Sequence, residues 1–147
     1  MAVTFFSIFL TGCFTTGGNI QSFSDIQEKE WKLVQVYING VDTQFRRVNQ
    51  PEMLGDIFTL TFDREIVSGT GAPNLFSAPY TLGDGQSINI MVMRSTLMAP
   101  LFEPENLSEH EYFTFLQNAS TWRLVRNRLE IYSTTQDGRE VRLVFAL

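Results

Sequence analysis

The sequence predicts an α+β protein in which an antiparallel sheet curls toward a barrel and a single helix covers one opening. Short runs rich in aromatic and β-branched residues recur along the chain, separated by Gly, Pro, Asn and Asp at turn positions. One segment in the last third combines a helix-capping motif with helical periodicity. The length of 147 residues suits one domain.

The first strands follow from β-propensity and alternation. Residues 31–38 (WKLVQVYI) favour a strand, and residues 58–63 alternate apolar and polar side chains, as in a half-buried strand. A short strand is expected at 66–69. Residues 77–82 and 87–93 should then form a hairpin, because the Gly-Asp-Gly-Gln sequence between them is a turn signal.

The helix should begin at Ser108. Ser108 and Glu111 form a capping box, in which the Ser108 side chain bonds the Glu111 backbone and the Glu111 carboxylate bonds back. Apolar residues between Tyr112 and Ala119 then recur at helical spacing. The chain returns to strands at 122–125, 129–133 and 140–145, with a turn at Asp137-Gly138.

Charge and composition exclude some classes of protein. The net charge of −5 argues against sequence-independent nucleic-acid binding, which needs cations to neutralise phosphates. Apolar residues make up 44% of the chain, which is typical of a globular domain. With one cysteine, Cys13, the chain cannot form an internal disulfide. No metal site or cofactor is expected.

The N-terminus has the features of an export signal. The apolar run at 5–10 is too short to span a bilayer but fits a signal-peptide core. The sequence Leu10-Thr11-Gly12-Cys13 resembles a bacterial lipobox, which implies a diacylglyceryl group on the Cys13 thiol, cleavage before Cys13, and acylation of the new amino group, for example with palmitate. Residues 1–4 lack the expected Lys or Arg. The alternative is a buried first strand with an incidental cysteine.

The lipobox resemblance divides the chain into three parts. Residues 1–12 are the signal peptide, residues 13–29 are a lipidated cysteine with a flexible tether, and residues 30–147 are the folded domain. The tether is rich in Ser, Thr, Gly, Asn and Gln, as flexible linkers are. Because Phe14 and not aspartate follows the cysteine, known sorting rules favour the outer membrane, with the domain facing the periplasm.

The middle of the chain carries a more specific pattern. Residues 67–81 (VSGTGAPNLFSAPYT) are followed after the hairpin by Thr96-Leu97-Met98-Ala99, and later by Glu111-Tyr112-Phe113-Thr114-Phe115-Leu116. In this order and spacing they resemble the META domain family, whose HslJ-like members are small bacterial envelope proteins. The motif residues are Gly69, Gly71, Asn74, Tyr80, Thr96 and Met98. The resemblance covers residues 30–146.

Two prolines depart from the family pattern. Pro73 and Pro100 stand where many members of the family carry cysteines. Their joint replacement suggests that the two positions are neighbours in the fold, within the ~7 Å between Cα atoms that a disulfide can bridge. Thiol chemistry of that kind is excluded here.

Several polar residues have a structural and a functional interpretation. Gly69 and Gly71 are expected to be turn glycines and not a phosphate cradle, since no Lys-Ser/Thr follows them. Asn74 either faces a ligand or, as we favour, bonds its own turn. His110 should be solvated. The acidic residues between 103 and 111 are expected to be solvated rather than to bind a cation.

The last strands concentrate positive charge. Arg123, Arg126, Arg128 and Arg142, with Arg139 nearby, form a possible basic surface strip. One role is cross-strand pairing with Glu130 and Glu140. The other is contact with an acidic envelope polymer or an unknown envelope protein.

These observations predict a lipid-anchored, non-catalytic binding or structural module, which the resemblance associates with envelope stress. One alternative is a small cell-wall hydrolase, which would need a carboxylate pair with one perturbed pKa. Another is an inhibitor or partner-binding domain that uses a loop, at residues 49–55 or 100–107.

Overall fold

The computed structural model describes residues 22–45, 56–99 and 104–147. The predictions for Cys13, for residues 1–21, for Pro100 and for the loop at 49–55 lie outside these ranges. The neighbour hypothesis for Pro73 and Pro100 therefore stays a prediction. Within the ranges, no helix is long and apolar enough to cross a membrane.

The elements agree closely with the predicted ones. They are η1 (Phe23–Asp25), β1 (Trp31–Ile38), β2 (Val41–Asp42), β3 (Thr59–Phe62), β4 (Ile66–Thr70), β5 (Leu75–Leu82), β6 (Ile88–Ile90), β7 (Arg94–Ser95), α1 (Glu109–Gln117), β8 (Ala119–Val125), β9 (Arg128–Thr134) and β10 (Glu140–Ala146).

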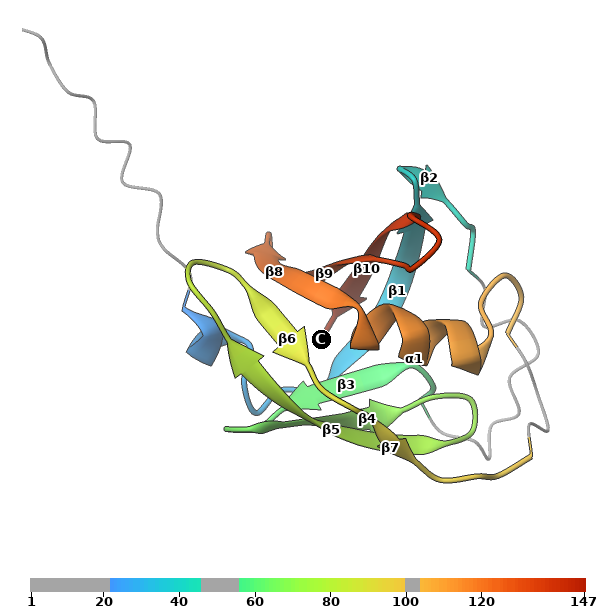
Figure 1. Ribbon diagram of the computed structural model, residues 1–147, viewed down its shortest axis with the longest axis horizontal. Helices are drawn as coiled ribbons and strands as arrows, with labels where there is room; N and C mark the ends of the chain where they lie inside the picture. The colour runs from blue at the N-terminus through green and yellow to red at the C-terminus, as the bar shows by residue number, and fades with distance from the viewer. Residues whose placement is uncertain (1–21, 46–55, 100–103) are drawn as a thin grey trace, which may run out of the picture.

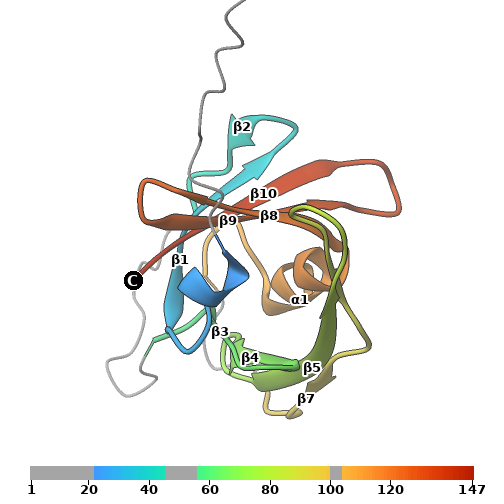
Figure 2. The ribbon, with the colours of Figure 1, turned by 90° about the vertical axis from the view of Figure 1, so that its left-hand side faces the viewer.

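The strands form one antiparallel sheet in the order β6-β5-β4-β3-β1-β10-β9-β8, with β2 beside β1 and β7 beside β5. The sheet curls until its two ends approach each other, where Ser87 bridges Thr121 and Trp122 N donates to Gln86 O at 2.9 Å. Figures 1 and 2 show α1 between β8–β10 on one side and β3–β5 on the other. The predicted curled sheet with one helix is confirmed.

The core holds large aromatic side chains from both halves of the barrel. Trp31 and Tyr112 are buried with Phe58, Phe62, Phe115 and Phe145. Their polar atoms are satisfied, since Trp31 Nε1 donates to Ile26 O at 2.9 Å and the Tyr112 hydroxyl donates to Thr59 O at 3.0 Å. Buried Trp and Tyr need such partners, because an unpaired polar group in a core is costly.

The domain begins earlier than expected. Phe23 in η1 packs against the rings of Phe62, Tyr80 and Trp122, with centroid distances of 5.2, 5.4 and 5.2 Å. Ile26 is completely buried. The predicted boundary at residue 30 is therefore too late, because two apolar residues in an otherwise polar segment anchor it to the core.

The helix begins as predicted and ends earlier. Ser108 Oγ accepts from Glu111 N at 3.2 Å, and Glu111 Oε2 accepts from Ser108 N at 3.0 Å, which completes the capping box. Asn118 ends α1 as its C-cap. Ala119, which we expected on the helix, is the first residue of β8 and is buried there.

Candidate functional site

The motif residues converge on a corner between β4 and β5, which we call the 71–74 corner (Gly71, Ala72, Pro73, Asn74). Gly71 N donates to Asn74 O at 2.5 Å, which closes the corner. The Asn74 side chain is buried and turns away from its own corner toward the segment after β7 and the start of α1. The predicted bond from this side chain to its own turn is therefore wrong.

Every polar atom of the Asn74 side chain has a partner. Oδ1 accepts from Met98 N at 2.7 Å and from the Thr96 hydroxyl at 2.8 Å. Nδ2 donates to Glu109 Oε2 at 2.7 Å and to Met98 O at 3.2 Å. Three motif residues distant in the sequence are thus joined through one amide, which indicates that they hold the fold together.

Glu109 completes this cluster, and sequence reasoning missed it. Its Oε1 accepts from Ala72 N at 2.5 Å and from Asn74 N at 2.6 Å. We expected it in a solvated acidic stretch, whereas it is half-buried against the 71–74 corner. As the first residue of α1, it also places a negative charge where the helix dipole favours one. Its place at the start of the predicted helix was the sequence signal that could have identified this role.

The motif glycines allow close approach of other segments, and only Gly71 lies in a turn. Gly69 lies inside β4, and a Cβ added there would stand 2.0 Å from Thr59 O. A Cβ on Gly71 would stand 2.4 Å from Glu109 Oε1 and 2.7 Å from the Phe113 ring. The predicted turn position is wrong for Gly69 and confirmed for Gly71, and at both positions the space for a side chain is taken by residues that are distant in the sequence.

Tyr80 lies in another part of the core. Its hydroxyl donates to Asp63 O at 2.6 Å and accepts from Gln27 Nε2 at 3.0 Å. Burial of the ring raises the pKa of the phenol. Tyr80 therefore ties η1 and the β3–β4 turn to β5, away from the 71–74 corner.

The basic strip is one surface, the outward face of β1, β10, β9 and β8. Arg142 pairs with Tyr37 on β1 and with Tyr132 on β9, so the three side chains share this face. Arg123 on β8 stands opposite Glu130 on β9. Arg128 begins β9, and Arg126 lies in the turn before it, with φ +50°. We call this surface the arginine face.

Arginines and tyrosines alternate across the arginine face. The Arg142 guanidinium lies 4.1 Å from the centre of the Tyr37 ring, and that of Arg123 lies 5.3 Å from the centre of the Tyr132 ring. Such contacts hold a cation in place at low cost in hydration. Arg128 Nη1 donates to Gln35 Oε1 at 3.2 Å.

Glu130 is the carboxylate within this face. Its Oε2 accepts from the Tyr132 hydroxyl at 2.5 Å, while its Oε1 lies 3.6 Å from Arg142 Nη1. The expected pairing of the strip with Glu130 is thus present, though at a longer distance than a good charge-assisted bond of ~2.7–2.9 Å. Burial, and then the bond to Glu130, raise the pKa of Tyr132, so the phenol stays a donor.

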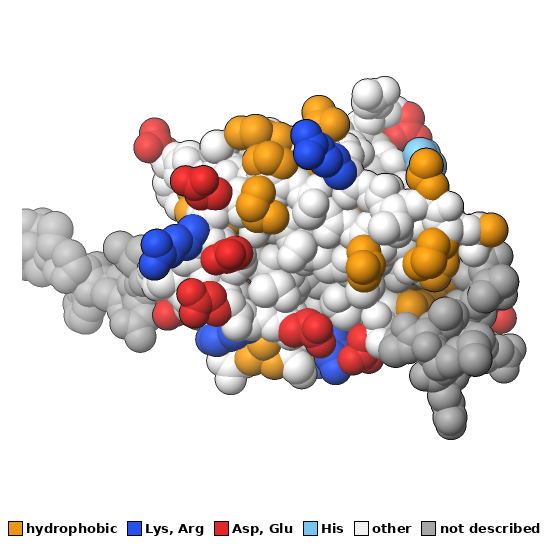
Figure 3. Space-filling model, turned by 90° about the horizontal axis from the view of Figure 1, so that it is seen from below, with side chains coloured by type: hydrophobic (Ala, Val, Ile, Leu, Met, Phe, Trp, Pro, Cys, Tyr) orange, Lys and Arg blue, Asp and Glu red, His pale blue; other side chains and the backbone are white. Residues whose placement is uncertain are grey.

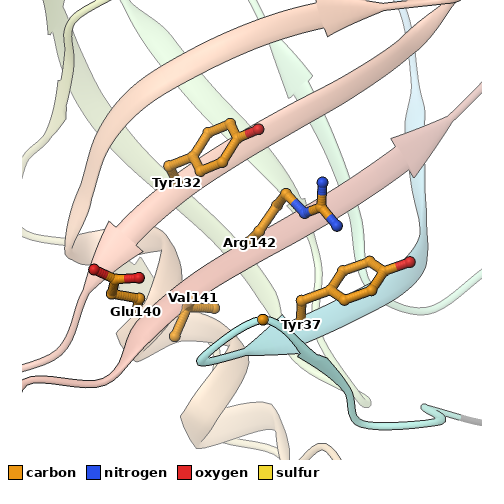
Figure 4. A pocket seen from close by; sticks show the side chains of 6 residues that line it. Tyr37, Tyr132, Glu140, Val141 and Arg142 are labelled. Atoms are coloured by element: carbon orange, nitrogen blue, oxygen red, sulfur yellow. The ribbon is translucent and has the colours of Figure 1, made fainter.

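A hollow of about 200 Å³ opens on this face. It is lined by Tyr37, Gly40, Tyr132, Glu140, Val141 and Arg142. Figure 4 shows Arg142 between the two tyrosines, which come from the strands on either side of β10. The hollow therefore combines a held cation with two amphipathic rings.

The other candidate residues stay apart. His110 is exposed on α1, as expected. Across 22–45, 56–99 and 104–147, no three His, Cys, Asp or Glu side chains are grouped so that they could hold a metal ion. Val92 and Leu97 are among the exposed apolar side chains. On the face that Figure 3 shows, apolar side chains lie in separate groups.

Comparisons with known proteins agree with this architecture. Residues 24–146 match the META domain. A solved structure described as the NMR structure of the protein from Burkholderia xenovorans has a TM-score of 0.56 and 18% sequence identity, over 84% of this chain and 85% of that one. At this identity the likeness concerns the fold. A comparison with curated proteins found no match. Because the matched region spans nearly the whole chain, this protein belongs to the META domain family.

Proposed function

We propose that this META domain is a non-catalytic binding module, that a lipid on Cys13 holds it at the envelope, and that its arginine face binds an acidic envelope polymer. The anchor rests on the lipobox-like sequence, with the outer membrane and its periplasmic side as the expected place. A role in envelope stress rests on the family resemblance alone.

The use of the motif residues supports a role without catalysis. Asn74 and Glu109 form the densest polar cluster of the motif, and their bonds go to Met98, Thr96 and the backbone of the 71–74 corner. Groups that act on a substrate need atoms that are free to reach it. Here the motif supports the fold and leaves recognition to another surface.

The positive charge of the arginine face is the observation that supports an acidic polymer as the ligand. The chain as a whole has a net charge of −5, yet the arginine face holds four arginines (Arg123, Arg126, Arg128 and Arg142) against Glu130 and Glu140. Two of these arginines are held against tyrosine rings. A local positive surface on an acidic protein attracts polyanions, and the held side chains lose less entropy on binding.

Binding of a polyanion tests this proposal. We expect the full-length chain in detergent to bind polygalacturonate and not neutral dextran in isothermal titration calorimetry. Affinity should fall steeply with added salt, because the attraction is electrostatic. The double substitution Arg123→Gln/Arg128→Gln should weaken binding by about tenfold at low ionic strength.

The matched control removes two arginines from the other half of the barrel, with Arg64→Gln/Arg94→Gln. Arg64 lies in the β3–β4 turn and Arg94 in β7, and both are exposed. Equal losses in the two double variants would show that total charge and not the arginine face governs binding, and would contradict the proposal. So would equal binding of dextran.

Lipid attachment is tested separately by intact-mass analysis of the protein purified from its own envelope. We expect a mass that lacks residues 1–12 and includes acyl chains, and we expect Cys13→Ser to remain uncleaved and to carry no acyl chains. Acyl chains contribute ~0.8 kcal/mol for each buried CH₂, so several chains give stable anchoring. An unmodified Cys13 in the mature protein would refute the anchor.

A further inference from the structure

We infer that the hollow around Arg142 is a subsite for a single acidic sugar unit, whose acid group binds the Arg142 guanidinium between Tyr37 and Tyr132. This inference rests on the proposed function, since it names the unit of the acidic polymer that the arginine face would bind. The shared chemistry is an anionic group carried on a ring of hydroxyls, whether carboxylate or phosphate.

The first support is that Arg142 is held in place beside the hollow by three neighbours. The centre of its guanidinium lies 4.1 Å from the centre of the Tyr37 ring, and its side chain also bonds the Tyr132 hydroxyl. The nearest carboxylate contact recorded for it, Glu130 Oε1, stands at 3.6 Å. The other Glu130 oxygen is bonded to the Tyr132 hydroxyl at 2.5 Å. An anion that enters the hollow would therefore add a charge-assisted bond to a guanidinium whose ion pair with Glu130 is long.

The second support is the size of the hollow. About 200 Å³ is less than the 300–1,000 Å³ typical of sites for drug-sized ligands. It suits one ring-sized unit and not a folded peptide. Gly40 forms part of the wall at the turn after β1, where φ is +78° and a Cβ would meet nothing within 4 Å. That side of the hollow is open, so a unit within a longer polymer could enter it.

The third support is the mixed chemistry of the lining. Arg142 supplies donors for the acid group, and the exposed Glu140 supplies an acceptor for hydroxyls. The tyrosine rings offer apolar edges together with hydroxyls. A simple inorganic anion would use only Arg142. A ring with one acid group and several hydroxyls uses all of these groups.

The test is a ¹⁵N-NMR titration of the full-length chain in detergent with D-glucuronate, glucose 1-phosphate and D-glucose. We expect one or both acidic sugars to bind with a Kd on the order of millimolar and to shift the signals of Tyr37, Tyr132 and the Arg142 side chain. The two acids distinguish carboxylate from phosphate recognition. Arg142→Gln should weaken binding by about tenfold or more, because the charged bond is lost.

Arg94→Gln is the matched control and should leave binding unchanged, since Arg94 is exposed on β7. Tyr37→Leu should weaken binding several-fold, because it removes the ring that holds Arg142. The inference is overturned if glucose binds as well as the acids, if neither acid binds, or if Arg142→Gln has no effect. If one of these results is found and the protein still binds polygalacturonate, the subsite is wrong but the proposed function is not contradicted.

Discussion

Replacing Asn74 with alanine is expected to lower the free energy of unfolding by about 2–4 kcal/mol, because it removes the four hydrogen bonds of a buried amide that joins the segment after β7 and the start of α1 to the 71–74 corner. The amide oxygen serves Met98 N and the Thr96 hydroxyl, and the amide nitrogen serves Glu109. The half-buried Glu109 carboxylate would lose one of its three donors. Urea denaturation followed by circular dichroism measures the change.

Asn89→Ala is the matched control, since Asn89 is exposed on β6 and should change stability by less than about 0.5 kcal/mol. Asn74→Asp adds a sharper test. It would place a second carboxylate against Glu109 Oε2, where the amide donates at 2.7 Å. We expect Asn74→Asp to be strongly destabilised at neutral pH and partly restored in acid, where one carboxylate is protonated. Near-neutral stability for both Asn74 variants would refute the structural role of the cluster.

Gly69→Ala is expected to prevent folding or to cost more than about 3 kcal/mol. The added Cβ would stand 2.0 Å from Thr59 O and 2.7 Å from Thr59 C, which are backbone atoms of the neighbouring strand. It would also stand 2.9 Å from the Phe76 ring. Backbone in a paired strand cannot move away without breaking the ladder, so no cheap relaxation is available. Thermal unfolding by calorimetry, or the yield of soluble protein, reports the effect.

Ser68→Ala is the control for Gly69→Ala, because Ser68 is the preceding residue of β4 and its side chain is exposed. It should leave the melting temperature nearly unchanged. If Gly69→Ala has the same melting temperature as the wild type, β3 and β4 lie farther apart than described.

Local signals predicted most of the fold. Alternation found β3 and the β5–β6 hairpin, and the Ser108–Glu111 capping box found the start of α1 to the residue. Alternation and capping depend on residues that are close together in the chain, so they can be recognised in a single sequence. The charge of the arginine face was also visible, since five arginines occur within the last three strands and their turns.

Contacts between distant segments could not be predicted in this way. Glu109 looked like one solvated acid among several, and only the fold brings it within 2.5 Å of Ala72 N. Gly69 looked like a turn residue, because sequence does not show which backbone approaches it. Phe23 and Ile26 were assigned to a tether because the residues around them are polar. The pairing of Arg142 with Tyr37 also depends on strands at opposite ends of the domain.

The place of β1 has a consequence for biosynthesis. This strand lies between β3 and β10, and β10 is the last strand to leave the ribosome. Until Glu140–Ala146 emerges, β1 has one long edge without its partner, and the ring of strands cannot close. Such late, non-local pairing delays folding. A nascent chain of this design cannot close its barrel before β10 has been made.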